Sequence, residues 1–150
     1  MSDPYDIELS HTFSAPAARV WAALTAPDQF VRWYGPDGFP VDPATVEIDA
    51  RVGGRHRFVM VGEDDPSMRT GFDGSFTEVI PNNRLASSGT WHGIPGQDGG
   101  WASYLAVELS EEAEATHLVV REGPHPEGTA ELGRASWEMM LPKLAALLDD

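Results

Sequence analysis

The chain has 150 residues, with 24 acidic and 10 basic side chains and no cysteine, which gives a formal net charge of −14. A surface this acidic repels phosphate backbones and anionic lipids, so we expect binding to neither nucleic acid nor membrane. The absence of cysteine excludes disulfides, thiolate catalysis and Cys-ligated metals. Residues 1–10 lack the basic start and apolar core of a signal peptide, and we expect a cytoplasmic protein with a single domain over residues 1–150.

The first elements expected are a strand and two short helices. Ile7, Leu9 and Phe13 alternate with polar residues at the period of two that leaves one face of a strand buried. A helix should open near Pro16, because proline suits the first turn. A second short helix is expected over residues 27–32.

Six further strands are expected before the last helix. They lie around Val46 and Ile48 and over residues 55–61, 70–80, 84–91, 101–109 and 117–122. Short connections join them, including a Gly53-Gly54 hairpin turn and an acidic loop over residues 110–115. Consecutive strands with short connections predict an antiparallel meander.

The chain ends in a long amphipathic helix over residues 127–148, in which Pro142 should cause a bend rather than an end. A sheet must cover the apolar face of this helix. The predicted class is therefore α+β, with a curved seven-stranded antiparallel sheet wrapped around the C-terminal helix and two short helices after the first strand. The apolar face carries Trp137, Met140, Leu141, Leu144, Leu147 and Leu148 at helical spacing.

Several segments resemble a known family. Phe13-Ser14-Ala15-Pro16 followed by Val20-Trp21-Ala22-Ala23-Leu24-Thr25 resembles the first strand and helix of the START/birch-pollen-allergen (SRPBCC) superfamily. Three further pieces are similar to its AHSA-type branch, the homologues of the activator of heat-shock-protein ATPase: Trp33-Tyr34-Gly35-Pro36, Val52-Gly53-Gly54-Arg55, and Trp137 with Leu141 and Leu144. The resemblance implies a helix-grip fold that holds lipids, polyketides, hormones or aromatic compounds between sheet and helix, or that stimulates a chaperone ATPase. It supplies no universal catalytic residue.

Two departures from the family pattern bear on this cavity. His56 stands where members often have an aromatic residue, and Ala86-Ser87-Ser88-Gly89 stands where members often have a bulky strand. We therefore expect a roomier and more polar cavity than in such relatives.

Strand alternation and helical spacing point one set of side chains toward the space between sheet and helix. Most of them would pack a core in any fold, and the part that the core leaves unfilled would be the pocket. Trp33 is expected to pack beneath the short helices instead. We expect ligand contact at His56, Phe58, Met60, Phe72, Phe76, Trp91, Trp101, Ser103, Glu122, Trp137, Met140 and Leu144.

Strand ends in a meander should bring Trp91, His92, Trp101, Glu122 and His125 to one rim, near the N-terminus of the long helix. The tryptophans would line a ligand entrance or, alternatively, cap the core, with both histidines solvated. A metal would require His92, Glu122 and His125 to converge, and their spacing matches no known signature, so no metal or cofactor is expected.

The leading hypothesis is a non-covalent carrier or sensor of a small hydrophobic or aromatic molecule. One alternative is a protein-binding module that regulates a chaperone ATPase. Another is a cyclase- or lyase-like enzyme that uses His56 or His92 with Glu122 as an acid/base pair. A homodimer is compatible with the family, but the sequence does not decide the oligomeric state.

Overall fold

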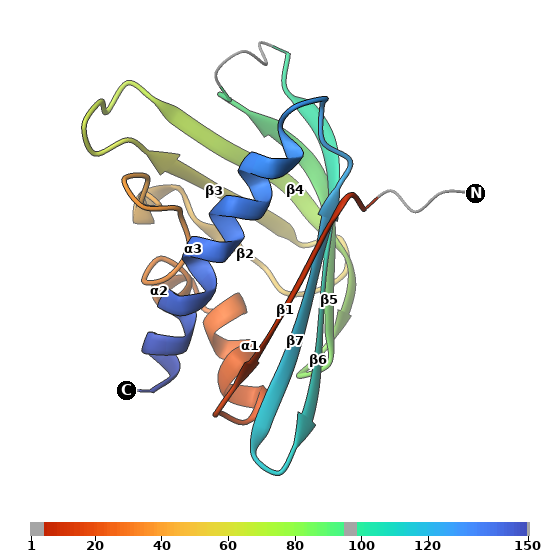
Figure 1. Ribbon diagram of the computed structural model, residues 1–150. Helices are drawn as coiled ribbons and strands as arrows, with labels where there is room; N and C mark the ends of the chain where they lie inside the picture. The colour runs from red at the N-terminus through yellow and green to blue at the C-terminus, as the bar shows by residue number, and fades with distance from the viewer. Residues whose placement is uncertain (1–4, 95–98, 150) are drawn as a thin grey trace.

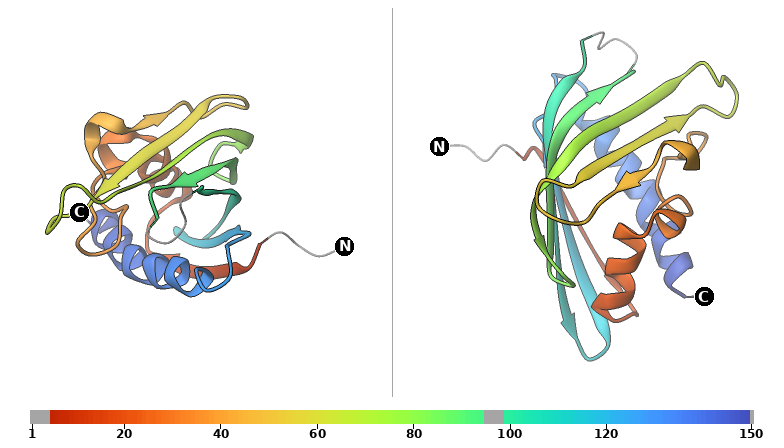
Figure 2. Two further views of the ribbon diagram at one scale, coloured as in Figure 1. Left: turned by 90° about the horizontal axis from the view of Figure 1, so that it is seen from above. Right: turned by 180° about the vertical axis from the view of Figure 1, so that it is seen from behind.

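The computed structural model describes residues 5–94 and 99–149. A seven-stranded antiparallel sheet curves around helix α3 (Ala130–Leu148), which crosses its concave face (Figure 1, Figure 2). The strand order is β1-β7-β6-β5-β4-β3-β2, so the first strand of the chain pairs with the last. These features confirm the predicted α+β class and helix-grip arrangement. Among the residues described, no helix has the length and apolar character that crossing a membrane requires.

The elements follow the predicted order. Two helices, α1 (Ala17–Thr25) and α2 (Pro27–Phe30), follow the first strand, and a 3₁₀ turn, η1 (Pro43–Thr45), precedes the second. The strands are β1 (Ile7–Phe13), β2 (Glu47–Ile48), β3 (Arg55–Val61), β4 (Arg69–Ile80), β5 (Arg84–His92), β6 (Trp101–Glu112) and β7 (Ala115–Gly123).

The predicted inward faces of the sheet are confirmed. His56, Phe58 and Met60 of β3 are buried, as are Leu118 and Val120 of β7. All six residues of the predicted apolar face of α3 are also buried. Sheet and helix thus form one core, because each covers the apolar face that the other cannot bury alone.

The predicted acidic loop over residues 110–115 is wrong. Strands β6 and β7 run through this segment, and Glu112 pairs with Ala115. Ala113 and Glu114 alone make the turn, with φ angles of 53° and 66°. Two consecutive positive φ angles suit a tight hairpin, but glycine or asparagine usually supplies them, so the composition hid the turn.

The bounds of two helices also differ from the prediction. α3 begins at Ala130 rather than at residue 127, because Gly128 has a φ of +85° and cannot be helical. The Thr129 hydroxyl donates to the carbonyl of Pro126 at 2.7 Å, which closes the preceding turn. The helix continues through Pro142, as expected. α2 ends at Phe30, two residues earlier than predicted.

The loop after α2 is fastened to both helical layers. Trp33 is buried and its Nε1–H donates to the Ala23 carbonyl at 2.8 Å, so it packs beneath the short helices as predicted. The amide of Gly35 donates to Met140 Sδ at 3.0 Å, and Lys143 Nζ donates to the Gly35 carbonyl at 2.5 Å. These contacts hold the residues on either side of Gly35 against α3.

Candidate ligand-binding site

A cavity of about 80 Å³ lies between the sheet and the first half of α3. One water molecule needs about 10–15 Å³ by such a measure, so the space admits a small molecule. Six residues of the predicted ligand set line it: Met60, Trp91, Trp101, Glu122, Trp137 and Met140. The other lining residues are Tyr34, Pro36, Ile94, His125, Thr129, Leu132, Gly133 and Ser136.

A second cavity, of about 10 Å³, lies beside the first and is lined by residues of β3, β4, β5 and β6. It shares Tyr34, Trp91 and Glu122 with the larger one, and these residues separate the two spaces. The predicted residues His56, Phe58, Phe72 and Ser103 line the smaller cavity. Phe76 and Leu144 line neither cavity and are buried in the core. Ligand contact at the twelve positions stays a prediction.

Four of the five expected rim residues meet at the larger cavity: Trp91, Trp101, Glu122 and His125. His92 does not join them, and this part of the prediction is wrong. Neighbouring side chains of a strand point to opposite faces, so the inward Trp91 sends His92 outward, beside its strand partner Gly71. The acid/base pair and the metal set that needed His92 are thereby excluded. No cluster of metal-binding side chains occurs among the residues described.

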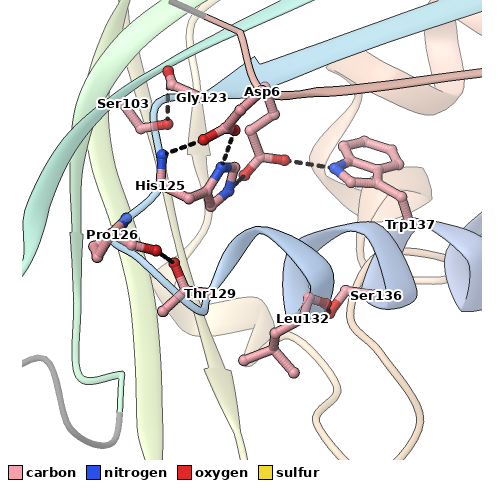
Figure 3. Close-up of polar contacts among 10 residues, drawn as sticks. Asp6, Ser103, Gly123, His125, Pro126, Thr129, Leu132, Ser136 and Trp137 are labelled. Atoms are coloured by element: carbon pink, nitrogen blue, oxygen red, sulfur yellow. Dashed lines mark hydrogen bonds and ion pairs between the residues drawn. The ribbon is translucent and has the colours of Figure 1, made fainter.

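A chain of polar contacts runs along one end of the cavity (Figure 3). The Asp6 carboxylate accepts from His125 Nδ1 at 2.6 Å and from the His125 amide at 2.8 Å. His125 Nε2 lies 3.6 Å from Glu122 Oε1. The other oxygen of Glu122 accepts from Trp137 Nε1 at 2.6 Å. These polar contacts therefore connect the segment before β1 to β7 and α3.

Burial and charge set the protonation states along this chain. Burial works against the imidazolium of His125, but its contacts with Glu122 and Asp6 outweigh this and raise the pKa above the ordinary value. Burial likewise opposes ionisation of Asp6, but the bonds it accepts from His125 lower its pKa. Burial, with Glu122 adding to it, raises the pKa of Tyr34 well above its usual value. The cavity end thus favours a protonated His125, an ionised Asp6 and a neutral Tyr34 phenol.

Strand register and one glycine bring these groups together. Ile7 pairs with Glu122 across β1 and β7, which places Asp6 beside the turn after β7. Gly133 faces this turn from α3, where a Cβ atom would lie 2.8 Å from Ile7 Cδ1 and 3.1 Å from His125 Nε2. The absence of a side chain at Gly133 therefore lets α3 approach Ile7 and His125 closely.

The indole N–H of Trp101, a residue that lines the cavity, is a hydrogen-bond donor whose partner is not found among the residues described. Its Nε1 is buried. A buried donor without a partner costs roughly 1–3 kcal/mol. The ring lies 6.1 Å from that of His125.

His56 is a neutral, packed histidine. Burial lowers its pKa to about 4. Its Nδ1 lies 3.0 Å from the Ser87 hydroxyl, and its ring stacks on Phe76 at 4.7 Å. His56 and Glu122 both border the 10 Å³ cavity, which has room for about one water. The enzyme hypothesis therefore lacks space for a substrate between this pair.

The small residues of β5 pack closely against their neighbours, and a cavity roomier than in relatives stays a prediction. A Cβ atom at Gly89 would lie 2.8 Å from Cζ of Phe72, so the Phe72 ring occupies the room over the glycine. Ser87 is buried and bonded to His56. The expected polarity at this end is present, but most of the volume lies nearer to α3.

Several cavity residues were missed by the sequence prediction. Gly133 lies four residues before Trp137 and Ser136 lies four residues before Met140, so the helical period that located the apolar face could have found them. Tyr34 and Pro36 belong to a segment used only for the family resemblance. Asp6 carries no local signal, because only the strand register pairs it with His125.

A sheet that curves around one helix, with a mostly apolar cavity between them, defines a helix-grip protein. The family model described as "Activator of Hsp90 ATPase homolog 1-like protein" matches residues 14–149, and the chain belongs to this family. The resemblance to the AHSA-type branch is thereby confirmed. Among curated proteins, none is significantly similar in sequence to the chain.

Solved structures share the fold. A protein from Chromobacterium violaceum is 25% identical with a TM-score of 0.83, and the match covers 96% of this chain and 97% of that one. An AHSA1 protein from Silicibacter pomeroyi is 23% identical with a TM-score of 0.78, over 95% and 96% of the two chains. A protein from Arthrobacter aurescens is 23% identical with a TM-score of 0.79, over 95% and 84%.

Proposed function

We propose that the protein binds a small hydrophobic or aromatic molecule, without covalent chemistry, in the cavity between the sheet and α3, as a carrier or sensor. The observation that carries this proposal is the wall of the larger cavity. Trp91, Trp101 and Trp137 supply aromatic surface, and Met60 and Met140 supply adaptable thioethers. A mostly apolar cavity with a few convergent polar groups is typical of a small-molecule site.

Binding is favoured over catalysis by the state of the polar side chains. The Ser103 hydroxyl donates to the carbonyl of Gly123 at 3.1 Å, so it is not poised as a nucleophile. His56 faces a space too small for a substrate.

The volume sets the expected affinity. A cavity of about 80 Å³ suits a ligand of roughly one aromatic ring. At about 0.5–0.8 kcal/mol per non-hydrogen atom, eight atoms give dissociation constants from about a millimolar to tens of micromolar. Assays should therefore use millimolar ligand.

A pair of variants on α3 tests the proposal. Ser136 lines the cavity, and Ser136→Phe should fill it, whereas Ala146 is exposed on the same helix and Ala146→Phe is the control. Millimolar toluene and naphthalene should raise Tm in the wild type and in Ala146→Phe, but not in Ser136→Phe. Equal shifts in all three proteins, or no shift with any compound, would contradict binding in this cavity.

A second candidate function is the regulation of a chaperone ATPase, as the family description suggests. The observation in its favour is an exposed apolar pair on α3. Leu132 is 58% and Met139 is 42% exposed, and their spacing of seven places them on one helix face. Stimulation of an Hsp90-class ATPase that Leu132→Asp abolishes would support this function. If the wild type does not stimulate the ATPase, this second function is refuted. Sedimentation of the wild type and Leu132→Asp would show whether the same face mediates a homodimer.

A further inference from the structure

We propose that the cavity selects an organic cation, namely a protonated amine on a small aromatic or apolar body. This inference rests on the proposed function and specifies its ligand class. It goes beyond hydrophobic binding because it assigns Glu122 the role of ligand counter-ion.

The charges around the cavity leave Glu122 without full compensation. Of the described lining residues, only Glu122 and His125 are ionisable at neutral pH, and the Glu122 side chain is 8% exposed. The imidazole of His125 is closer to Asp6, at 2.6 Å, than to Glu122, at 3.6 Å. Asp6 and Glu122 therefore share the single positive charge that His125 can carry. The three groups together carry a net charge of −1 even when His125 is protonated.

A buried carboxylate in this state is a favourable neighbour for a cation. Its Oε2 already accepts from the neutral indole of Trp137, but this bond brings no positive charge. Burial of an incompletely paired charge is costly, and a ligand ammonium would reduce that cost. A carboxylate ligand, in contrast, would be repelled.

The aromatic wall adds to this preference. Tyr34, Trp91, Trp101 and Trp137 line the same space as Glu122. The faces of aromatic rings attract cations, and cages of such rings bind ammonium groups. The net charge of −14 also draws cations toward the protein.

A structural role for Glu122 makes a different prediction. If the carboxylate served only to hold Trp137 and His125 in place, ligand charge would not affect binding. Glu122→Gln separates these roles, because the amide oxygen can still accept from Trp137 Nε1 while the charge is lost.

The test is an NMR titration of the full chain with benzylamine, benzyl alcohol and benzoate, which carry different charges on the same ring. The indole N–H signals of Trp91, Trp101 and Trp137 report on the cavity. The indole N–H signal of Trp21, which lines neither cavity, serves as the internal control.

Benzylamine should bind about tenfold more tightly than benzyl alcohol, with benzoate weakest, and Glu122→Gln should abolish this preference while changing the alcohol affinity by less than about threefold. Equal affinities in the wild type, or a preference that survives in Glu122→Gln, overturn the inference. Equal affinities in the wild type would decide against the inference even if the variant does not fold. If the alcohol binds without any charge preference, the inference fails while the proposed function stands. If none of the three probes moves the cavity signals, both fail.

Discussion

The same substitution at two buried tryptophans tests whether the buried Glu122 carboxylate is a charged hydrogen-bond acceptor. Trp137 and Trp33 are 3% and 1% exposed. Trp137 Nε1 donates to the Glu122 carboxylate at 2.6 Å, whereas Trp33 Nε1 donates to the neutral carbonyl of Ala23 at 2.8 Å. Replacement by Phe removes the same donor and a similar volume at both sites, so the two variants differ mainly in the acceptor that is left behind.

The expected difference follows from the charge of the acceptor. A hydrogen bond to a charged group contributes about 1.5–3 kcal/mol, and a neutral one about 0.5–1.5 kcal/mol. Trp137→Phe should therefore lower the free energy of unfolding by about 1 kcal/mol more than Trp33→Phe. In a domain of this size that difference corresponds to a Tm about 2–4 °C lower.

Urea denaturation of both variants at pH 7 measures this difference, with calorimetry for Tm. An equal loss, or a larger loss for Trp33→Phe, would refute the claim that Glu122 is an ionised, buried acceptor. A normal m-value in both variants is the control that the unfolding remains comparable.

Three further predictions concern stability. The folded-state pKa of His125 is raised, so the stability that its protonation contributes is complete below about pH 6.5 and is lost as pH rises through the folded-state pKa. Urea denaturation should show this loss in the wild type and a smaller loss in Asp6→Asn. His56 has a folded-state pKa of about 4, so the free energy of unfolding should fall by up to about 3 kcal/mol as pH falls from 6.5 to 4. An equal fall over this pH range in His56→Phe would contradict the burial of His56 as a neutral group. Gly133→Ala should destabilise the protein, because the new Cβ atom would lie 2.8 Å from Ile7 Cδ1, although the change gains about 1 kcal/mol of helix propensity. A variant that urea denaturation shows to be more stable than the wild type would argue against this close approach.

The elements that periodicity governs could be predicted from the sequence. The inward faces of β3 and β7 and the apolar face of α3 follow from alternation and helical spacing, since burial selects apolar residues at those positions. The turn at Ala113 and Glu114 could not, because these residue types give no turn signal.

The site was less accessible to such reasoning, because it depends on contacts between distant segments. The meeting of strand ends in a meander predicted His92 at the same rim as Trp91, but alternation in β5 points their side chains to opposite faces of the sheet. Asp6 and His125 meet only through the register of β1 and β7. Which space stays open also depends on rings such as Phe72, whose positions no local pattern specifies.

The most direct test of a ligand-binding cavity is native mass spectrometry of the wild type and Ser136→Phe, purified from cells without added ligand. The account predicts that the wild type carries a small molecule, or gains one mass equivalent of benzylamine in the gas phase, and that Ser136→Phe does neither. A wild-type spectrum with only the mass of the chain, unchanged by benzylamine, would contradict it.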